Sequence, residues 1–461
     1  MDTNYQKLQN KQIRFFNDGR WNDVYYRISL LKKLKSTIEE YEDQILEALY
    51  KDLKKPAAEA YASELLVVYK ELNTFIKKIK SWEKPSFKLP SLINFPSVDF
   101  IYHKPWGQVL IISPWNYPFQ LAINPLIAAL ACGNTVILKP SEFSVHTSQI
   151  LYKIINHVFP KEVAQVCQGD ATTASKLLDL KWDYIFFTGS VQVGKIVAKA
   201  AAINLTPLTL ELGGKNPCIV DTTAKLDIAA RRIVWGKFLN AGQTCIAPDY
   251  LVVHESIKNQ LTEKIIAEIR NFYGDQPIES PDFARIINHK HFQRLVKLFH
   301  NKDEVRYGGK HEENELYVAP TILINPSLDD EVMQEEIFGP ILPVLTYTDE
   351  NELHHILKKH PNPLSFYIFT ENKYFSKKLM QKFNFGGAVI NDTIVHFVND
   401  RLPFGGVGNS GLGSYHGKHS FATFTRKTSV VDRKTWLDLD VKYAPYAGKL
   451  NLLRKVKNWL T

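Results

Sequence analysis

The chain has 461 residues, of which 45% are hydrophobic and 23% are charged. At roughly 150 residues per domain, this length suggests two or three domains, and the composition excludes a disordered or fibrous protein. Lysine and arginine outnumber aspartate and glutamate by 57 to 48, which gives a net charge of +9. Spread over so long a chain, this charge is weak evidence for an anionic partner such as nucleic acid, and we expect none.

The cysteine content and the N-terminal sequence bear on the compartment. The 4 cysteines are too few for a secreted disulfide framework, and no two of them form a CxxC pair. The first residues lack the apolar core of a signal peptide. The most apolar stretch, residues 121–138, is interrupted by proline, glycine and asparagine and is a poor membrane span. We therefore expect a cytoplasmic, multi-domain protein.

The first part of the chain changes character twice. Apolar residues recur at helical spacing within residues 1–80, so we expect helices that cover a face of another part. Prolines forbid a helix over 84–105 and indicate an extended segment. From residue 108, strands alternate with helices, which predicts a parallel sheet that binds ligands beyond the carboxyl ends of its strands. The expected strands are 108–112, 135–138, 163–166, 184–187 and 208–211, and the expected helices are 119–131, 147–158, 171–179 and 191–202.

A second alternating run starts near Pro217 and predicts a second α/β domain with its own sheet. A glycine-dense stretch, 404–413, follows this run and precedes an expected strand at 422–431. The expected strands of the run are 218–220, 250–253, 341–347, 366–369 and 388–390, and the expected helices are 228–239, 257–272 and 351–358.

The chain ends in a basic amphipathic tail. Its apolar face consists of Leu452, Leu453, Val456, Trp459 and Leu460. Such a helix could contact an anionic membrane surface. Because this one is short, we expect its apolar face to pack on the protein instead.

Two residues could form a nucleophile and its base. Cys245 ends the segment Asn240-Ala-Gly-Gln-Thr-Cys and follows an expected helix. A loop cysteine between domains can be exposed and deprotonated, although a lone cysteine is more often a small core residue. Glu211 ends an expected strand, where a carboxylate either faces the ligand crevice or lies in water. Together the two residues provide the pairing that covalent catalysis needs.

Three further features could bind ligand groups. Asn116 projects from a loop fixed by two prolines, where it could donate to an oxyanion or form an ordinary Asx turn. The segment 186–194 places backbone N–H groups at a helix start, which is an anion site, but its glycine spacing is not GxGxxG. Glu142 follows the strand that ends near Lys139 and is placed to bond a ribose hydroxyl.

The other cysteines and one pair of histidines have structural rather than functional interpretations. Cys132, Cys167 and Cys218 have apolar neighbours in the sequence and are expected in the core. His289 and His291 resemble a metal pair, but the sequence indicates no third ligand nearby. We expect these two histidines on a surface turn and no metal site.

In this order along the chain, these segments resemble the aldehyde dehydrogenase superfamily over about residues 5–435. The matching blocks are Pro114-Trp-Asn-Tyr-Pro, Leu138-Lys-Pro-Ser-Glu, Phe187-Thr-Gly-Ser, Leu210-Glu-Leu-Gly-Gly-Lys, Gly242-Gln-Thr-Cys, Glu335-Glu-Ile-Phe-Gly-Pro and Pro403-Phe-Gly-Gly-Val-Gly-Asn-Ser-Gly. The short N-terminus and the context around Glu211 are similar to the class 3 branch, which acts on fatty and aromatic aldehydes. The resemblance implies NAD(P)-dependent oxidation of an apolar aldehyde to the carboxylate through a cysteine thiohemiacetal and a thioester.

The resemblance also implies site residues. By it, Cys245 is the nucleophile, Glu211 is the base for deacylation and Asn116 is the oxyanion donor. The implied cofactor is NAD, with NADP as the alternative, because an acid at Glu142 favours free ribose hydroxyls. The implied cofactor contacts are Trp115, Lys139, Glu142, Gly189, Ser190, Gly194, Glu336 and Phe338, and the implied aldehyde contacts are Tyr117, Trp235 and Phe404.

The implied architecture is a Rossmann-like cofactor domain (1–83 and 103–210), an α/β catalytic domain (211–405), a small β oligomerisation arm (84–102 and 420–435) and a basic tail (436–461). An exposed arm has unpaired strand edges, so we expect a homodimer.

Two alternatives to this reading remain. A CoA-acylating dehydrogenase is disfavoured by Glu211, because a dedicated water base is superfluous there. A non-enzymatic protein that uses its basic surface to bind nucleic acid or membrane would be supported by loss of Cys245 or Glu211, and both are present.

Overall fold

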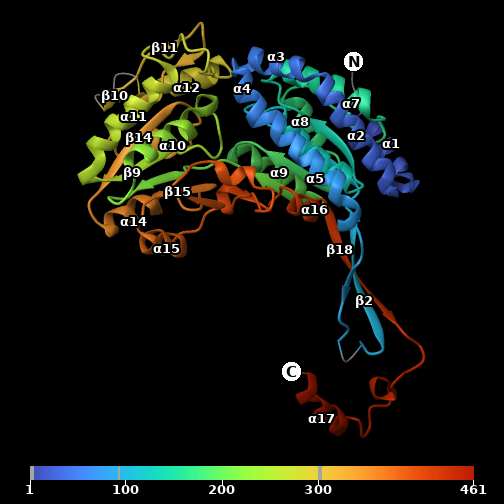
Figure 1. The fold of residues 1–461 in the computed structure, drawn as a ribbon. Helices are drawn as coiled ribbons and strands as arrows, with labels where there is room; N and C mark the ends of the chain where they lie inside the picture. Colours follow the sequence, from blue (N-terminus) through green and yellow to red (C-terminus); the bar gives the residue numbers. More distant parts are fainter. Residues whose placement is uncertain (1–4, 92–93, 300–303, 461) are drawn as a thin grey trace.

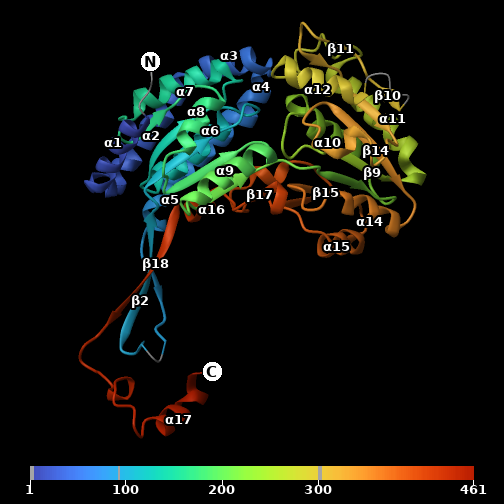
Figure 2. The same cartoon turned by 180° about the vertical axis from the view of Figure 1, so that it is seen from behind.

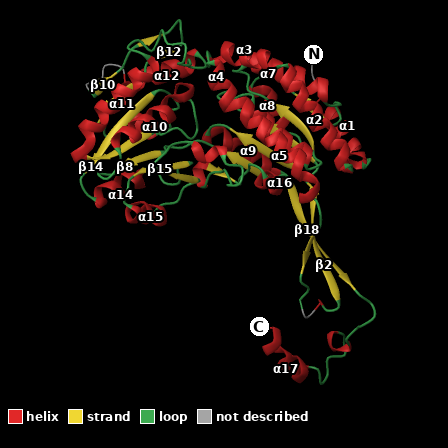
Figure 3. Ribbon diagram, in the orientation of Figure 1, coloured by secondary structure: helices red, strands yellow, loops and turns green. Residues whose placement is uncertain are grey.

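Two largely parallel sheets and a projecting β arm make up the computed structural model, which describes residues 5–91, 94–299 and 304–460 (Figure 1). Helices cover the sheets, and the arm extends away from both of them (Figure 2). The alternation of strands and helices along the chain confirms the predicted α/β class (Figure 3).

Helices form the N-terminal part, as predicted. They are α1 (Tyr5–Asn17), α2 (Val24–Glu40), α3 (Glu42–Leu53), α4 (Ala57–Ala60) and α5 (Leu66–Trp82). A π-helical turn, Tyr61–Leu65, separates the last two. Leucines at helical spacing, such as Leu31 and Leu34, are buried in one hydrophobic core with α6 (Gln120–Ala131) and α7 (Val145–Val158). These helices therefore cover the first sheet rather than form a separate unit.

The first sheet has the strand order β17-β7-β6-β3-β4-β5. Its strands are β3 (Gln108–Ile112), β4 (Thr135–Lys139), β5 (Ala164–Val166), β6 (Tyr184–Thr188), β7 (Leu208–Glu211) and β17 (Gly411–Leu412), and its connecting helices include α8 (Ala171–Leu178) and α9 (Val191–Ile203). All neighbouring pairs are parallel except β17 with β7. The β17 pairing places Gly411 opposite Glu211, so the glycine-dense stretch lies beside the end of β7.

The second sheet has the order β10-β13-β14-β9-β8-β15-β16 and is parallel except for the edge strand β10. Its strands are β8 (Pro217–Val220), β9 (Tyr250–His254), β10 (Val305–Tyr307), β13 (Thr321–Ile324), β14 (Ile341–Tyr347), β15 (Ser365–Phe369) and β16 (Gly387–Ile390). The helices of this part are α10 (Leu226–Phe238), α11 (Lys258–Tyr273), α12 (His289–Phe299), α13 (Glu331–Gln334), α14 (Glu350–Lys359) and α15 (Lys373–Lys382), and a short hairpin joins β11 (His311–Glu312) to β12 (Tyr317–Val318).

The arm is an antiparallel sheet of β1 (Ser86–Lys88), β2 (Ser97–Pro105) and β18 (Thr425–Arg433). The strand expected at 422–431 begins later, because Lys418–Thr423 forms the helix α16. Phe421 and Phe424 are both buried, and their separation by three residues matches a helical turn rather than strand alternation.

The described part of the tail does not pack as expected. Its helix α17 (Leu450–Leu460) lies beyond the arm, away from the two sheets (Figures 1 and 2). Leu453, expected on the packed face, is 48% exposed. The chain between the arm and this helix consists mostly of exposed residues, so it does not bring the helix back onto the body of the protein. The other side chains of the expected apolar face, Leu452, Val456, Trp459 and Leu460, lie outside the described ones. Within the described ranges, none of the helices is both long and apolar enough to span a bilayer.

Candidate active site

Cys245 lies on the loop that follows α10 and is half-buried. In this loop Asn240 and Ala241 both have positive φ angles, 53° and 51°, a strained conformation for residues other than glycine. Such strain persists only where neighbours fix the backbone. Here the side chain of Asn216 donates to the carbonyl of Cys245 at 2.8 Å, and the side chain of Gln243 donates to the carbonyl of Asn240 at 3.0 Å. The loop therefore holds its cysteine in a defined place.

Asn116 meets this loop from the other sheet. It follows β3, and its side-chain amide donates to the carbonyl of Gln243 at 3.0 Å. Its own carbonyl accepts from the side chain of Asn240 at 2.8 Å. The next residue, Tyr117, shares a 2.7 Å hydrogen bond between its hydroxyl and that of Thr244. The structure thus brings the predicted oxyanion donor and one predicted aldehyde contact to the cysteine loop.

Glu211 ends β7 and is buried. Neither of its carboxyl oxygens has a hydrogen-bond partner among the described residues. Burial raises its pKa well above the usual value for a carboxyl. A buried carboxyl without a partner is costly, and such groups are concentrated at functional sites.

The thiol of Cys245 is held in its neutral form. Burial raises its pKa, and the carboxyls of Glu336 and Glu211 raise it further when they are charged. Burial also raises the pKa of Glu336 to about 8, with a contribution from the charge of Asp249. Because the thiolate is the reactive form, attack by this sulfur has to be coupled to transfer of its proton.

A buried ion pair holds the backbone on either side of Glu336. Lys215 and Asp249 are 2.6 Å apart and both buried. Lys215 also donates to the carbonyl of Glu335 at 3.0 Å, and Asp249 accepts from the backbone N–H of Ile337 at 3.0 Å. The backbone is therefore fixed on both sides of Glu336.

Trp115 and Phe338, both implied cofactor contacts, pack edge to face with ring centroids 5.3 Å apart. The ring centroid of His291 lies 5.0 Å from that of Trp115 and 6.5 Å from that of Phe143. Burial lowers the pKa of His291 to about 4, so the ring is neutral at physiological pH. His291 therefore belongs to the aromatic wall of the candidate site.

The expected surface turn at His289 and His291 is wrong, because both lie in the first turn of α12. The side chain of Asn288 accepts from the N–H of His291 at 2.9 Å and caps this helix. Asn288 followed by apolar Phe292 and Leu295 at helical spacing is the sequence signal that would have found it. In the described part of the chain, no group of three or more histidine, cysteine or acidic side chains could hold a metal ion.

The start of α9 has the features of a phosphate site. Ser190 is its N-cap, and the Ser190 hydroxyl accepts from the N–H of Val193 at 3.4 Å. A Cβ at Gly194 would come 2.7 Å from Leu212, so this glycine allows α9 to pack closely. A Cβ at Gly213 would meet the Glu336 carboxyl at 1.9 Å, so the backbone there must be bare. The N–H groups at the start of α9 can bind the pyrophosphate of a dinucleotide, and the bare backbone allows its close approach. The nearby carboxyl of Glu336 can accept from a ribose hydroxyl.

Lys139 and Glu142 form an ion pair of 2.7 Å at the end of β4. Lys139 is buried, whereas the Glu142 side chain is 32% exposed. The pair lies at the carboxyl edge of the first sheet, where a ribose is expected to bind. The Glu142 carboxylate can therefore reach a ligand while the Lys139 ammonium balances its charge.

The three implied aldehyde contacts have different surroundings. Phe404 is buried and stacks on His416 at 5.3 Å. Tyr117 is buried beside the cysteine loop, and Trp235 is 38% exposed on α10. Within the described residues, no ring contact joins the three to one another. Tyr117 is hydrogen-bonded to the loop of Cys245, and Phe404 belongs to the hydrophobic cluster against which Cys245 packs.

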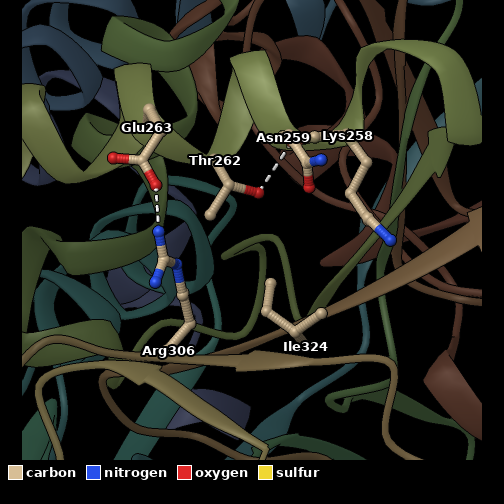
Figure 4. A pocket seen from close by; sticks show the side chains of 6 residues that line it. All are labelled: Lys258, Asn259, Thr262, Glu263, Arg306 and Ile324. Carbon is tan, nitrogen blue, oxygen red and sulfur yellow. Dashed lines mark hydrogen bonds and ion pairs between the residues drawn. The ribbon is translucent and has the colours of Figure 1, made fainter.

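A separate surface cavity of about 380 Å³ lies between α11 and the edge of the second sheet (Figure 4). It is lined by Lys258, Asn259, Thr262, Glu263, Arg306 and Ile324. The 2.6 Å ion pair between Glu263 and Arg306 links its two sides. None of its lining residues belongs to the candidate active site.

Comparisons with known proteins show which family the chain resembles in sequence and fold. The sequence pattern of the aldehyde dehydrogenase family matches residues 16–430. The chain is 46% identical to 4,4'-diaponeurosporen-aldehyde dehydrogenase of Staphylococcus aureus, over 95% of this chain and 96% of that protein. It is 42% identical to the dimeric NADP-preferring aldehyde dehydrogenase of Canis lupus familiaris, over 94% and 96%. The substrate-bound structure of Staphylococcus aureus AldH superposes with a TM-score of 0.96 at 44% identity, over 99% of each chain.

Proposed function

The chain belongs to the aldehyde dehydrogenase family and is an NAD(P)-dependent oxidoreductase, and we propose that it oxidises apolar aldehydes with Cys245, Glu211 and Asn116. One observation carries the assignment of these residues. The Asn116 amide is bound to the loop of Cys245, and the unpartnered Glu211 carboxyl is close enough for its charge to act on the thiol. A nucleophile, an oxyanion donor and a base therefore share one buried site.

The residues divide the reaction between them. Cys245 releases its proton to solvent water as its sulfur attacks the aldehyde carbon, and the oxyanion of the thiohemiacetal accepts from the amide of Asn116 and the backbone N–H of Cys245. A bound nicotinamide dinucleotide supplies the hydride acceptor. Glu211 then removes a proton from the water that hydrolyses the thioester, which releases the carboxylate product.

The apolar substrate class is supported by the aromatic side chains around the site. Tyr117 beside the cysteine loop and the buried Phe404 offer apolar walls. Each CH₂ buried against such walls contributes about 0.8 kcal/mol. The Staphylococcus aureus relative is named for 4,4'-diaponeurosporen-aldehyde.

A panel of straight-chain aldehydes tests the substrate class. NADH formation is measured without CoA, with aldehydes of about two to ten carbons, because each buried CH₂ should tighten binding. KM is expected to fall several-fold up to about six or eight carbons and then level off. A flat profile would contradict the apolar class, and a strict need for CoA would favour the acylating alternative.

Cys245→Ala should abolish turnover, and Glu211→Gln should leave a stoichiometric burst of NADH followed by slow turnover.

We also propose that the two sheets have different functions. We assign cofactor binding to residues 1–83 and 103–210, catalysis to 211–405 and oligomerisation to the arm, with NAD favoured over NADP and a cytoplasmic location expected. Trp115, Phe338, Glu336 and the start of α9 are the proposed contacts to the dinucleotide. The affinities for NAD and for NADP are measured from the change in protein fluorescence as each dinucleotide is added until the change is complete.

We also propose a homodimer. The outer edges of β1 and β18 have no neighbouring strand within the described chain, and such edges invite pairing. On α9 and its following turn, Ile196, Ile203 and Leu205 are 61%, 80% and 89% exposed. The relative from Canis lupus familiaris is named as dimeric. Light scattering should give twice the chain mass of 52.9 kDa, and Ile203→Glu with Leu205→Glu should lower it to one chain.

A further inference from the structure

A fully buried ion pair lies behind the Asn116 loop. Lys55 follows α3, and Glu64 lies in the π-helical turn before α5. The ammonium of Lys55 and the carboxylate of Glu64 are 2.6 Å apart, and both side chains are 0% exposed. Neither residue belongs to the sequence blocks that indicate the family.

Both charged groups bind the backbone of the loop that carries Asn116. Lys55 donates to the carbonyl oxygen of Asn116 at 3.2 Å. The second oxygen of the Glu64 carboxylate accepts from the N–H groups of Phe119 at 2.9 Å and Gln120 at 3.1 Å. The pair therefore fixes the chain at Asn116 and again three residues later, where α6 begins.

The same pair also contacts the next side chain. The Lys55 ammonium lies over the ring of Tyr117, 4.2 Å from its centroid, which is a cation–π contact. Tyr117 in turn bonds Thr244, the neighbour of Cys245. The contacts of Lys55 thus reach the cysteine loop through Tyr117 as well as through Asn116.

Stability alone does not account for this arrangement. A buried ion pair can often be replaced by apolar residues of similar volume at no cost in stability, because desolvation offsets the attraction. Charge-assisted hydrogen bonds to a backbone, by contrast, fix its position more strictly than apolar packing does. The π-helical turn that carries Glu64 is a feature often found at functional sites.

We propose that Lys55 and Glu64 are positioning residues that aim the side-chain amide of Asn116 at the oxyanion of the thiohemiacetal. This inference rests on the proposed role of Asn116. The pair touches neither substrate nor cofactor, and it acts through the backbone at Asn116. Its loss should slow formation of the acyl-enzyme and leave the affinity for NAD and the reactivity of Cys245 unchanged.

The central test is the double variant Lys55→Met with Glu64→Leu, which keeps the buried volume and removes both charges. The pre-steady-state rate of the NADH burst is measured together with Tm, NAD affinity and the rate of Cys245 alkylation by iodoacetamide. We expect a burst about 10- to 100-fold slower with NAD affinity and alkylation unchanged, and a lower Tm because the N–H groups of Phe119 and Gln120 lose their acceptor. Arg27→Met is the matched control, because Arg27 pairs with Glu83 at 2.5 Å among the same helices, away from Asn116.

A double-mutant cycle shows whether the pair acts through Asn116. In an Asn116→Ala background, the Lys55→Met and Glu64→Leu changes should slow the burst by less than twofold more. A burst at the wild-type rate in the folded double variant would overturn the inference, as would a full additional loss in the Asn116→Ala background. A wild-type burst in Asn116→Ala alone would instead overturn the proposed role of Asn116. If the double variant does not fold, Lys55→Gln with Glu64→Gln gives the same readouts, because it removes both charges and keeps a neutral acceptor for the N–H groups of Phe119 and Gln120.

Discussion

The amide of Asn116 and the carbonyl of Gln243 are joined by a 3.0 Å hydrogen bond across 127 residues of sequence. Asn116 belongs to a loop of the first sheet, and Gln243 precedes Cys245 by two residues on a loop beside the second. A side-chain amide has two N–H donors, so this bond orients the group and leaves one donor for a ligand. The site is thus assembled only when the two sheets are correctly placed.

Asn116→Ala should remove an oxyanion donor. The burst rate is expected to fall by 10²- to 10³-fold, about 2.7–4 kcal/mol of transition-state stabilisation, because the donor acts where charge develops. The measurement is stopped-flow absorbance of NADH with excess aldehyde. NAD affinity serves as the control and should not change. A loss below tenfold would show that the remaining backbone donor suffices.

Glu336→Gln should make the thiol of Cys245 more reactive, but only at alkaline pH. The Glu336 charge raises the pKa of the thiol, and Glu336 itself has a pKa of about 8. Below pH 8 its carboxyl is mostly neutral, so variant and wild type should be alkylated by iodoacetamide at similar rates. At pH 9.5 the charged Glu336 disfavours the thiolate in the wild type alone, so the variant should react faster. The exposed neighbour Glu335 supplies the control Glu335→Gln, and equal rates for Glu336→Gln and wild type at pH 9.5 would refute the coupling.

Glu142→Gln should raise the use of NADP relative to NAD. A carboxylate near the ribose repels a 2′-phosphate, while the neighbouring Lys139, 2.7 Å away, attracts it. Removing the negative charge leaves the attraction. The ratio of kcat/KM for NADP to that for NAD is expected to rise several-fold, and Lys139→Met should lower it. An unchanged ratio in Glu142→Gln would remove this residue from the ribose site.

The sequence predicts best what depends on local pattern. The strands that end at Ile112 and Glu211 are apolar runs bounded by turns, so their positions follow from periodicity. The roles of Lys55 and Glu64 could not be predicted, because charged residues among helices usually face water. Contacts that are distant in sequence, such as that of Lys55 with Asn116, 61 residues away, show that this pair is buried against the site. The surface turn expected at His291 is wrong for a different reason, because the cap at Asn288 makes this segment the first turn of a helix.

Glu71→Gln should stabilise the protein at alkaline pH. Glu71 is buried, and it accepts from the N–H of Gly417 at 3.2 Å and from the hydroxyl of Ser420 at 3.3 Å. Burial, the largest cause, raises its pKa from 4.5 to about 7 despite these bonds. The folded state therefore binds this proton more tightly, so the contribution of Glu71 to stability is most favourable below pH 4.5 and is lost as the pH rises to about 7. The difference amounts to about 3 kcal/mol above pH 7, and a neutral amide avoids it. We expect the Tm of Glu71→Gln to exceed that of the wild type by a few degrees at pH 8 and by much less at pH 5. The exposed Glu40→Gln is the control, and an equal gain at both pH values would mean that packing, not the charge of Glu71, causes the effect.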